Sequence, residues 1–199
     1  MKKAIGLLAF CAVFFGNTFA QKTPAGSAAF DSILNEHLSA SGAGVSALVS
    51  RGGKIIYQNA AGLANVELRV PMRTDNVFRI GSITKQFTAI AILQLMEGGK
   101  LNLQDTITRF LPGYPMHGAT ITIEHLLTHT SGIRDFTGLT DSAQRYKLDV
   151  EPAELVRYFS QLPLRFAPGT RYEYSNSNYA LLGAIIETIT GGTYRQYVE

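Results

Sequence analysis

Cysteine is nearly missing from this chain, whose 199 residues include only Cys11. One thiol cannot form a disulfide within the chain, so we expect the fold to be stabilised by its apolar core alone. The preceding residue, Phe10, argues against Cys11 as a site of lipid attachment.

Apolar runs long enough to span a membrane are missing as well. The run Ala4–Gly16 is too short for a spanning helix, and it follows Lys2 and Lys3. Thr18 and Ala20 supply small residues at the −3 and −1 positions of a cleavage site. We therefore predict a signal peptide over residues 1–20 and a flexible lead-in over 21–29. The protein is then exported, periplasmic or secreted from a bacterium, with no membrane span after signal removal.

Charge is scarce and nearly balanced. Charged residues make up 17% of the chain, and the formal net charge of +3 falls to +1 once Lys2 and Lys3 are removed. This balance argues against nucleic acid or an anionic membrane as a partner. The 46% of hydrophobic residues is typical of a globular domain, and nothing in the sequence indicates an oligomeric state.

The first half of the chain predicts one helix followed by a hairpin. Apolar residues recur at helical spacing from Phe30 to Leu38, with Ser27 or Asp31 near the start. Residues 45–50 and 54–59 flank a Gly-Gly turn and predict two antiparallel strands. Two strands make too small a sheet to be stable, so we expect further strands outside these 199 residues.

The second half predicts a series of helices, which gives an α+β fold class. Asp105 is expected to cap a short helix that ends near Pro112, and Thr122 to cap a helix over 123–128. Pro152 is typical of a first helical position. A last long helix is expected to begin at Ser177 or Asn178.

The segment Arg79–Met96 contains a Ser-x-x-Lys sequence, formed by Ser82 and Lys85, at the start of a long apolar run. The apolar residues of this run surround the helical wheel, so we expect a helix that is buried on all sides. Ser82 at its start, with the Lys85 amine one turn along, favours an activated nucleophile. The plainer alternative is an N-cap serine beside a solvated lysine.

Three segments together resemble the serine β-lactamase and penicillin-binding family, in particular the branch of class C β-lactamases, D-alanyl-D-alanine carboxypeptidases and related esterases. They are Phe78–Phe87, Ile123–Ile133 and Tyr174–Gly183. The likeness extends over nearly all of the chain after the lead-in. It implies a β-lactamase-like fold of an antiparallel sheet with helices and an all-helical region, of which residues 30–199 would be the N-terminal portion.

The resemblance also implies roles for four residues. Ser82 would be the nucleophile, and Lys85 the base or the group that holds the base. Tyr174 would be a phenol with a lowered pKa that exchanges protons with Ser82, and Asn176 would bind Lys85 and the substrate amide. The other Tyr-x-Asn sequence, 57–59, is interpreted as a coincidence. The family needs no metal and no organic cofactor for this chemistry.

The oxyanion of the reaction would be bound by the backbone N–H of Ser82 and by a second donor near a Lys-Thr-Gly sequence. No Lys-Thr-Gly follows Tyr174 in these 199 residues. The sequence therefore indicates a C-terminally incomplete domain.

Two other groups of residues could suggest a different site. His125 and His129 have the i, i+4 spacing of metal ligands, but no third ligand accompanies them, so a structural role is favoured. Ser131, His129 and Asp135 could form a hydrolytic triad, but residues so close in sequence seldom reach triad geometry. We set both aside.

The sequence thus predicts an exported serine hydrolase that acts through an acyl-enzyme. Its substrate would be a β-lactam, a D-alanyl peptide derived from peptidoglycan, or a small ester. One alternative is a penicillin-binding or sensor module that is acylated without turnover. The other is an inactive truncated fragment of such an enzyme.

Overall fold

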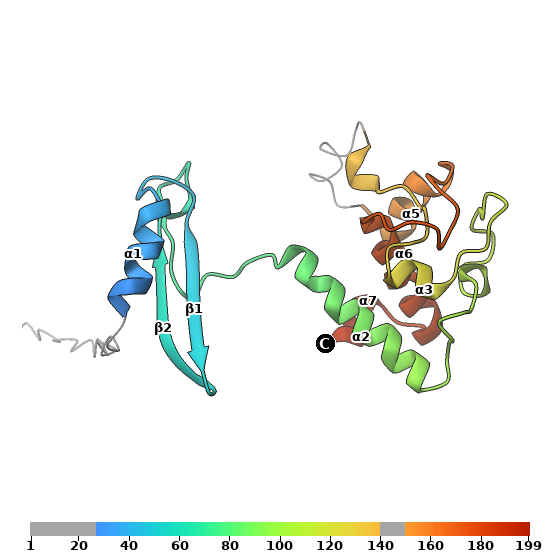
Figure 1. The fold of residues 1–199 in the computed structure, drawn as a ribbon, viewed down its shortest axis with the longest axis horizontal. Helices are drawn as coiled ribbons and strands as arrows, with labels where there is room; N and C mark the ends of the chain where they lie inside the picture. Colours follow the sequence, from blue (N-terminus) through green and yellow to red (C-terminus); the bar gives the residue numbers. More distant parts are fainter. Residues whose placement is uncertain (1–26, 140–149) are drawn as a thin grey trace, which may run out of the picture. The chain divides into compact units, whose positions relative to one another are not determined.

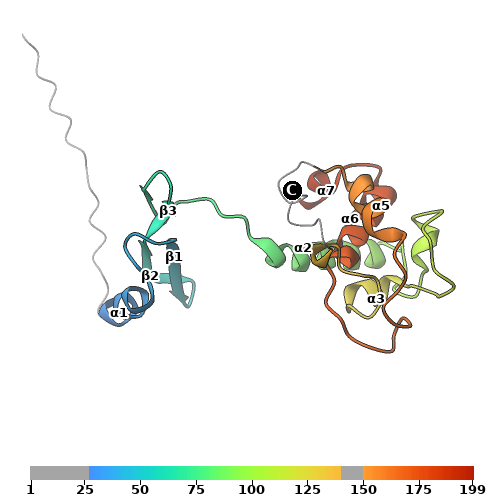
Figure 2. The ribbon, with the colours of Figure 1, turned by 90° about the horizontal axis from the view of Figure 1, so that it is seen from above.

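The computed structural model describes residues 27–139 and 150–199, which form two compact units (Figures 1 and 2). One unit ends at Phe78 and the other begins at Arg79. The expected signal peptide over residues 1–20 lies outside the described residues. Within the described ranges, no helix is both long and apolar enough to cross a membrane.

The first unit consists of a helix, a hairpin and two short strands. The hairpin prediction is confirmed, because its strands pair antiparallel from Val45↔Ala61 to Arg51↔Lys54 around the Gly52-Gly53 turn. The elements are α1 (Ser27–His37), β1 (Val45–Arg51), β2 (Lys54–Ala61), β3 (Leu63–Asn65) and β4 (Val70–Pro71). α1 begins at Ser27, inside the stretch 21–29 that was expected to be a lead-in, and residues 21–26 lie outside the described ranges.

α1 lies against β2 through a small polar and aromatic cluster (Figure 1). The rings of Phe30 and Tyr57 are 4.9 Å apart, and the Tyr57 hydroxyl donates to Asp31 at 2.7 Å. Asn59 donates to the same carboxylate at 2.8 Å. The Tyr-x-Asn sequence of β2 therefore ties α1 to the hairpin.

The second unit is helical, and its core surrounds α6 (Asn176–Thr190). Leu181, Leu182, Ile185 and Ile186 of α6 are fully buried. The unit's other elements are η1 (Gly81–Ile83), α2 (Thr84–Glu97), η2 (Ile107–Arg109), α3 (Ile123–Leu127), η3 (Phe136–Gly138), α5 (Pro152–Ser160) and α7 (Tyr194–Val198). α6 packs against α2, α3, α5 and α7, so it is the central helix of the unit. Helices together with small antiparallel sheets confirm the predicted α+β class.

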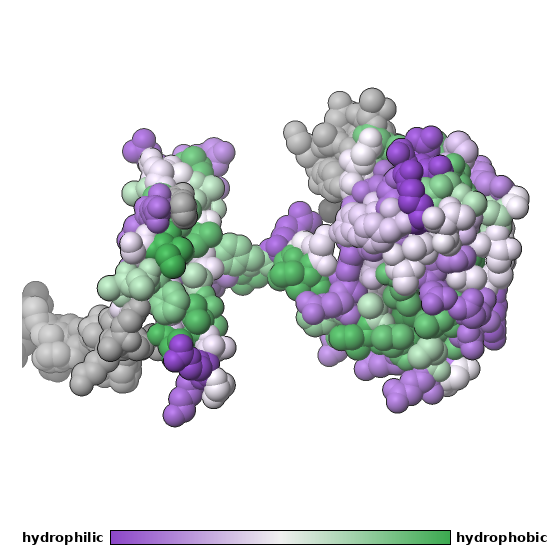
Figure 3. All heavy atoms as spheres, in the orientation of Figure 1, coloured by the Kyte–Doolittle hydropathy of each residue, from purple (hydrophilic) through white to green (hydrophobic). Residues whose placement is uncertain are grey.

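The prediction that the helix after Ser82 is buried on all sides is wrong for the described residues. Thr88, Ala91, Ile92 and Leu95 of α2 are buried, but its other side is solvent-accessible. Large apolar side chains exposed on α2 include Phe87 (45%), Ile90 (53%) and Leu93 (43%). Apolar areas are visible among hydrophilic ones on the surface of Figure 3. The reason is that the unit's own elements cover only one face of α2.

The capping predictions had mixed outcomes. Thr122 does cap α3, since its hydroxyl accepts from the His125 N–H at 3.3 Å, and Pro152 is the first residue of α5. Asp105 was wrongly predicted as a cap: Thr106 is the N-cap of η2. The Asp105 carboxylate instead accepts from the Asn102 N–H at 2.7 Å.

The start of α6 differs from the sequence prediction in a way that affects the site. The helix begins at Asn176 rather than at Ser177 or Asn178, because Ser175 is the last extended residue. Asn176 therefore lies in the first turn of the central helix.

Candidate active site

Ser82 and Lys85 are brought together by a short 3₁₀ turn that runs directly into α2. Gly81, at the start of this turn, has a φ of +53°, a conformation that glycine adopts without strain. Side chains three residues apart in such a turn lie on the same side. The Lys85 amine accordingly donates to Ser82 Oγ at 3.2 Å.

Tyr174 lies in the extended segment that leads into α6, and Asn176 is the first residue of that helix. The Tyr174 hydroxyl reaches Ser82, and the Asn176 amide oxygen reaches Lys85. The residue between them, Ser175, is only 1% exposed, because adjacent side chains in extended backbone point to opposite sides. The junction between this segment and α6 therefore brings the first and third residues of Tyr-x-Asn to the Ser82–Lys85 pair.

The four predicted residues form one connected hydrogen-bond network. Ser82 Oγ lies 2.7 Å from the Tyr174 hydroxyl, and the Lys85 amine donates to Asn176 Oδ1 at 2.7 Å. The Lys85 nitrogen is also 4.8 Å from the centre of the Tyr174 ring. Ser82 and Tyr174 are exposed, while Lys85 and Asn176 are half-buried. The structure therefore assembles a serine hydroxyl, a phenol and an amine at a solvent-accessible site.

The environment of Tyr174 favours its ionised form. Partial burial by itself raises the pKa of the phenol, but Lys85 and the hydrogen bond with Ser82 outweigh burial and lower the pKa below its usual value near 10. The phenolate form of Tyr174, 2.7 Å from the serine hydroxyl, can accept the proton of that hydroxyl.

His129 holds the segment that carries Tyr174. Its carbonyl accepts from the Glu173 N–H at 2.9 Å, and its Nδ1 accepts from the Ser175 N–H at 3.1 Å. The imidazole ring packs against the Tyr174 ring with the centres 4.6 Å apart. Burial, followed by the charge of Lys85, lowers the pKa of His129. The imidazole is therefore neutral near pH 7, with its proton on Nε2 as the Ser175 hydrogen bond requires.

His129 has a backbone conformation that is unusual for its residue type. Its φ of +58° lies in the left-handed region, which costs energy in residues other than glycine. The nearby Gly132 (φ +75°) has no room for a side chain, since a Cβ would lie 2.2 Å from the Phe166 carbonyl oxygen. The turn after α3 therefore packs tightly against the backbone of Phe166, in the segment that leads to α6.

A buried polar layer joins this turn to the start of α6. Ser131 Oγ donates to Asn178 Oδ1 at 2.6 Å and accepts from the Ile133 N–H at 3.1 Å. Ser177 Oγ donates to the Arg134 carbonyl at 2.7 Å. Buried polar groups satisfied in this way fix one arrangement of the backbone.

The two alternative constellations do not assemble. His125 Nδ1 accepts from the Thr122 N–H, and His129 Nδ1 from the Ser175 N–H, so both rings have backbone partners. Ser131 donates to Asn178 rather than to His129, and Asp135 binds Asn176. In the part of the chain that the structure describes, no three His, Cys, Asp or Glu residues form a metal-binding group.

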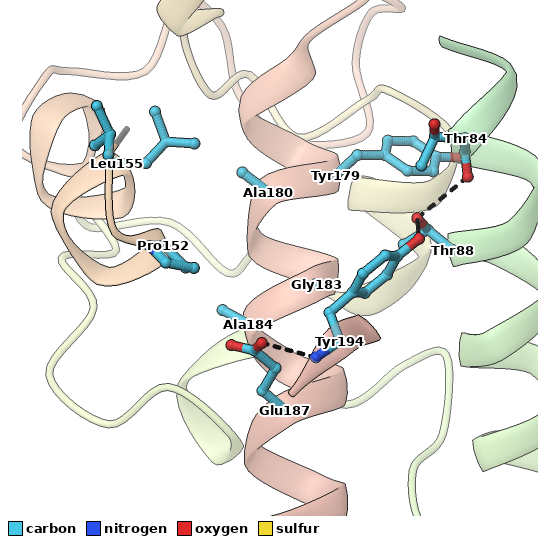
Figure 4. Close-up of a pocket in the computed structure, with 11 residues that line it drawn as sticks. Thr84, Thr88, Pro152, Leu155, Tyr179, Ala180, Gly183, Ala184, Glu187 and Tyr194 are labelled. Atoms are coloured by element: carbon cyan, nitrogen blue, oxygen red, sulfur yellow. Dashed lines mark hydrogen bonds between the residues drawn. The ribbon is translucent and has the colours of Figure 1, made fainter. Parts of the chain in front are cut away.

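A cavity of about 330 Å³ lies between helices α2, α5, α6 and α7 (Figure 4). Its wall includes the Tyr194 hydroxyl, 2.8 Å from Thr88 Oγ1, and Glu187, which accepts from the Tyr194 N–H. None of the four predicted site residues lines this cavity. Tyr179 does line it, and the centre of its ring is 5.5 Å from the Lys85 nitrogen.

Sequence reasoning placed the four site residues but missed most of the residues that support them. His129 and Asp135 were weighed only as members of other sites, and Asn178 and Tyr179 were assigned no role. The available signal was that Ile123–Ile133 and Tyr174–Gly183 both belong to the resemblance. Two such segments imply contact with each other, but not which side chains make it.

Comparison with known proteins agrees with the predicted family and fold. The family model described as Beta-lactamase matches residues 30–199. The chain is 38% identical over 180 residues to esterase EstB of Burkholderia gladioli, covering 82% of this chain and 44% of the esterase. It is 35% identical over 154 residues to penicillin-binding protein 4* of Bacillus subtilis, covering 76% and 34% of the two chains.

Solved structures of related proteins share the fold of this chain. D-amino acid amidase from Ochrobactrum anthropi SV3, complexed with L-phenylalanine, superposes with a TM-score of 0.73 at 32% identity, covering 86% of this chain and 47% of the amidase. An octameric penicillin-binding protein homologue from Pyrococcus abyssi gives 0.67 at 34% identity, covering 78% and 37%. The chain spans less than half the length of each of these four proteins.

Proposed function

Because this chain belongs to the beta-lactamase family, we propose that it acts as a serine hydrolase in which Ser82 is the nucleophile. The observation that supports this most directly is the 2.7 Å contact between Ser82 Oγ and the Tyr174 hydroxyl, with Lys85 bound to both Ser82 and Asn176. A nucleophile within hydrogen-bond reach of a base that a third group orients is the arrangement that acyl transfer needs.

In the proposed reaction, Ser82 Oγ forms a bond to the carbonyl carbon of the substrate while its proton passes to the ionised Tyr174. Tyr174 then gives the proton to the leaving amine or alkoxide, whose bond to the carbonyl carbon breaks. The product of this half-reaction is an acyl ester on Ser82. Water hydrolyses the ester and restores the serine. Lys85 stabilises the phenolate throughout, and no step needs a metal or an organic cofactor.

The proposed substrates are esters, D-amino acyl amides and β-lactams, which all present a carbonyl with a leaving oxygen or nitrogen. The relatives support this range by their names, which include an esterase, a penicillin-binding protein and a D-amino acid amidase. We also propose export after cleavage behind Ala20, on the basis of residues 1–20.

The test is the intact mass of the chain after incubation with a fluorophosphonate. Ser82 Oγ would attack phosphorus and displace fluoride, which adds one phosphonyl group. We expect one adduct on the wild type and none on Ser82→Ala. Ser50→Ala, which changes an exposed serine of β1, should be labelled like the wild type. An unlabelled but folded wild type, or equal labelling of Ser82→Ala, would overturn the proposal.

Acylation without turnover is the second candidate function. The 35% identity to penicillin-binding protein 4* favours it. A benzylpenicillin adduct on Ser82 that persists for hours would indicate binding alone, and one that disappears within minutes would indicate hydrolysis.

A further inference from the structure

Asp135 lies just outside the site, and its carboxylate is bound by Thr137 and Asn176. Oδ1 accepts from the Thr137 N–H at 3.1 Å and from the Asn176 N–H at 3.2 Å. Oδ2 accepts from Thr137 Oγ1 at 2.8 Å and from Asn176 Nδ2 at 3.1 Å. The carboxylate thus grips both the backbone and the side-chain amide of Asn176.

This contact determines which end of the Asn176 amide faces Lys85. An amide has a donor end and an acceptor end, and the carboxylate of Asp135 can only accept. Nδ2 therefore points to Asp135, and Oδ1 points to the Lys85 amine at 2.7 Å. A flipped amide would place its oxygen against the carboxylate and its N–H groups against the Lys85 donor, which is unfavourable at both ends.

We propose that Asp135 is a positioning residue that acts through Asn176 to hold Lys85 beside Ser82 and Tyr174. The inference rests on the function proposed above and extends it to a residue that does not touch the reacting atoms. The three charged or polar side chains form a chain from carboxylate to amide to amine. Charge at one end orients the amide, and the amide oxygen then fixes the amine.

A purely structural role for Asp135 is the competing explanation. Asp135 is the N-cap of η3, since it accepts from the Thr137 N–H. Asparagine is an equally good N-cap, so Asp135→Asn should leave the cap intact. The new amide could, however, pair with either end of Asn176, which removes the preference for one orientation. This substitution therefore separates capping from positioning.

The first test measures the rate of Ser82 labelling by a fluorophosphonate in Asp135→Asn, Asn176→Ala and the double variant. We expect Asp135→Asn to label about 10-fold slower, as is typical when an outer partner that orients a functional ligand is lost. In the Asn176→Ala background, Asp135→Asn should change the labelling rate by less than about 2-fold, because the effects of substitutions in one network are not additive. Asp105→Asn, which changes an aspartate that also accepts a local backbone N–H, should label at the wild-type rate.

The pH dependence of labelling gives a readout that a structural role would not move. Tyr174 is faced by Lys85, His129, Tyr179 and, across Asn176, Asp135. The negative charge of Asp135 by itself raises the pKa of Tyr174, so its direct loss would move the pH profile to lower pH. If Asp135→Asn instead displaces Lys85, the pKa of Tyr174 rises and the profile moves to higher pH. We expect this shift to higher pH in Asp135→Asn.

A second measurement tests the positioning without any reaction at Ser82. The side-chain amide signals of Asn176 in an NMR spectrum can be identified by their absence in Asn176→Ala. We expect them to shift in Asp135→Asn, because the carboxylate that accepts from Asn176 Nδ2 is replaced, and to stay unchanged in Asp105→Asn. An unlabelled wild type with these NMR responses would sink the proposed function alone. Additive rate effects, a profile shifted to lower pH or unresponsive amide signals would overturn the positioning role.

Discussion

The two units of the chain differ sharply in how much core they contain. Among the described residues before Arg79, Tyr57 is the one apolar side chain that is buried. The unit from Arg79 has a contiguous core around α6, and all four predicted site residues belong to it. A two-stranded hairpin is marginally stable at best, whereas a helical core can hold side chains in fixed positions. The geometry of the site therefore depends on the core of the helical unit.

A lysine in each unit provides the sharpest contrast. Lys85→Met removes the amine that binds Ser82 and Asn176, and should slow labelling of Ser82 by about 10² to 10⁴, the usual contribution of a proton-transfer group. Lys54→Met changes an exposed lysine of β2 and should leave the rate unchanged. Labelling kinetics by mass spectrometry measure both. Equal rates in the two variants would contradict the role of Lys85.

A leucine in each unit tests the difference in core. Leu182 of α6 is fully buried, so Leu182→Ala should lower the free energy of unfolding of the helical unit by about 2–5 kcal/mol. Leu48 of β1 is 55% exposed, so Leu48→Ala should change the free energy of unfolding of the first unit by less than about 0.5 kcal/mol. Urea unfolding followed by circular dichroism measures both changes. Similar losses would mean that the two units are not distinct in stability.

Paired serines test the buried layer beside the site. Ser131 has two hydrogen-bond partners, so Ser131→Ala should destabilise the protein by about 1–3 kcal/mol. Ser175 Oγ is buried without a partner among the described residues, so Ser175→Ala should be neutral or slightly stabilising. The same urea measurement applies. A large loss in Ser175→Ala would reveal a partner for its hydroxyl.

The smallest expected effect concerns pH and His129. The folded state lowers the pKa of this imidazole below 6.5, chiefly by burial, so protonation is easier in the unfolded chain. Its contribution to stability is present above about pH 6.5 and is lost as the pH falls from there through the folded-state pKa. Asn tolerates a positive φ and can accept the Ser175 N–H, so His129→Asn should keep the fold. The drop in Tm between pH 7.5 and pH 5 should be smaller in His129→Asn, and an equal drop would contradict this account.

The sequence predicted the four site residues, but not the residues that hold them in place. Ser82 and Lys85 were predicted from a short motif with a chemical reason for its spacing, and Tyr174 and Asn176 from the family resemblance. The orienting role of Asp135 could not be predicted, because it depends on a carboxylate of one loop meeting an amide 41 residues later. Apolar periodicity also failed for α2, since it shows which side chains are apolar but not which face has a neighbour, as exposed Phe87 illustrates.

The central claim is that Tyr174, with a lowered pKa, activates Ser82. The most direct test is the pH profile of Ser82 labelling in the wild type and in Tyr174→Phe, which keeps the ring against His129 but removes the hydroxyl. The account predicts that the wild-type rate rises with a midpoint below pH 10, and that this rise is lost in Tyr174→Phe together with most of the rate. Coincident profiles in the two proteins would show that the phenol takes no part.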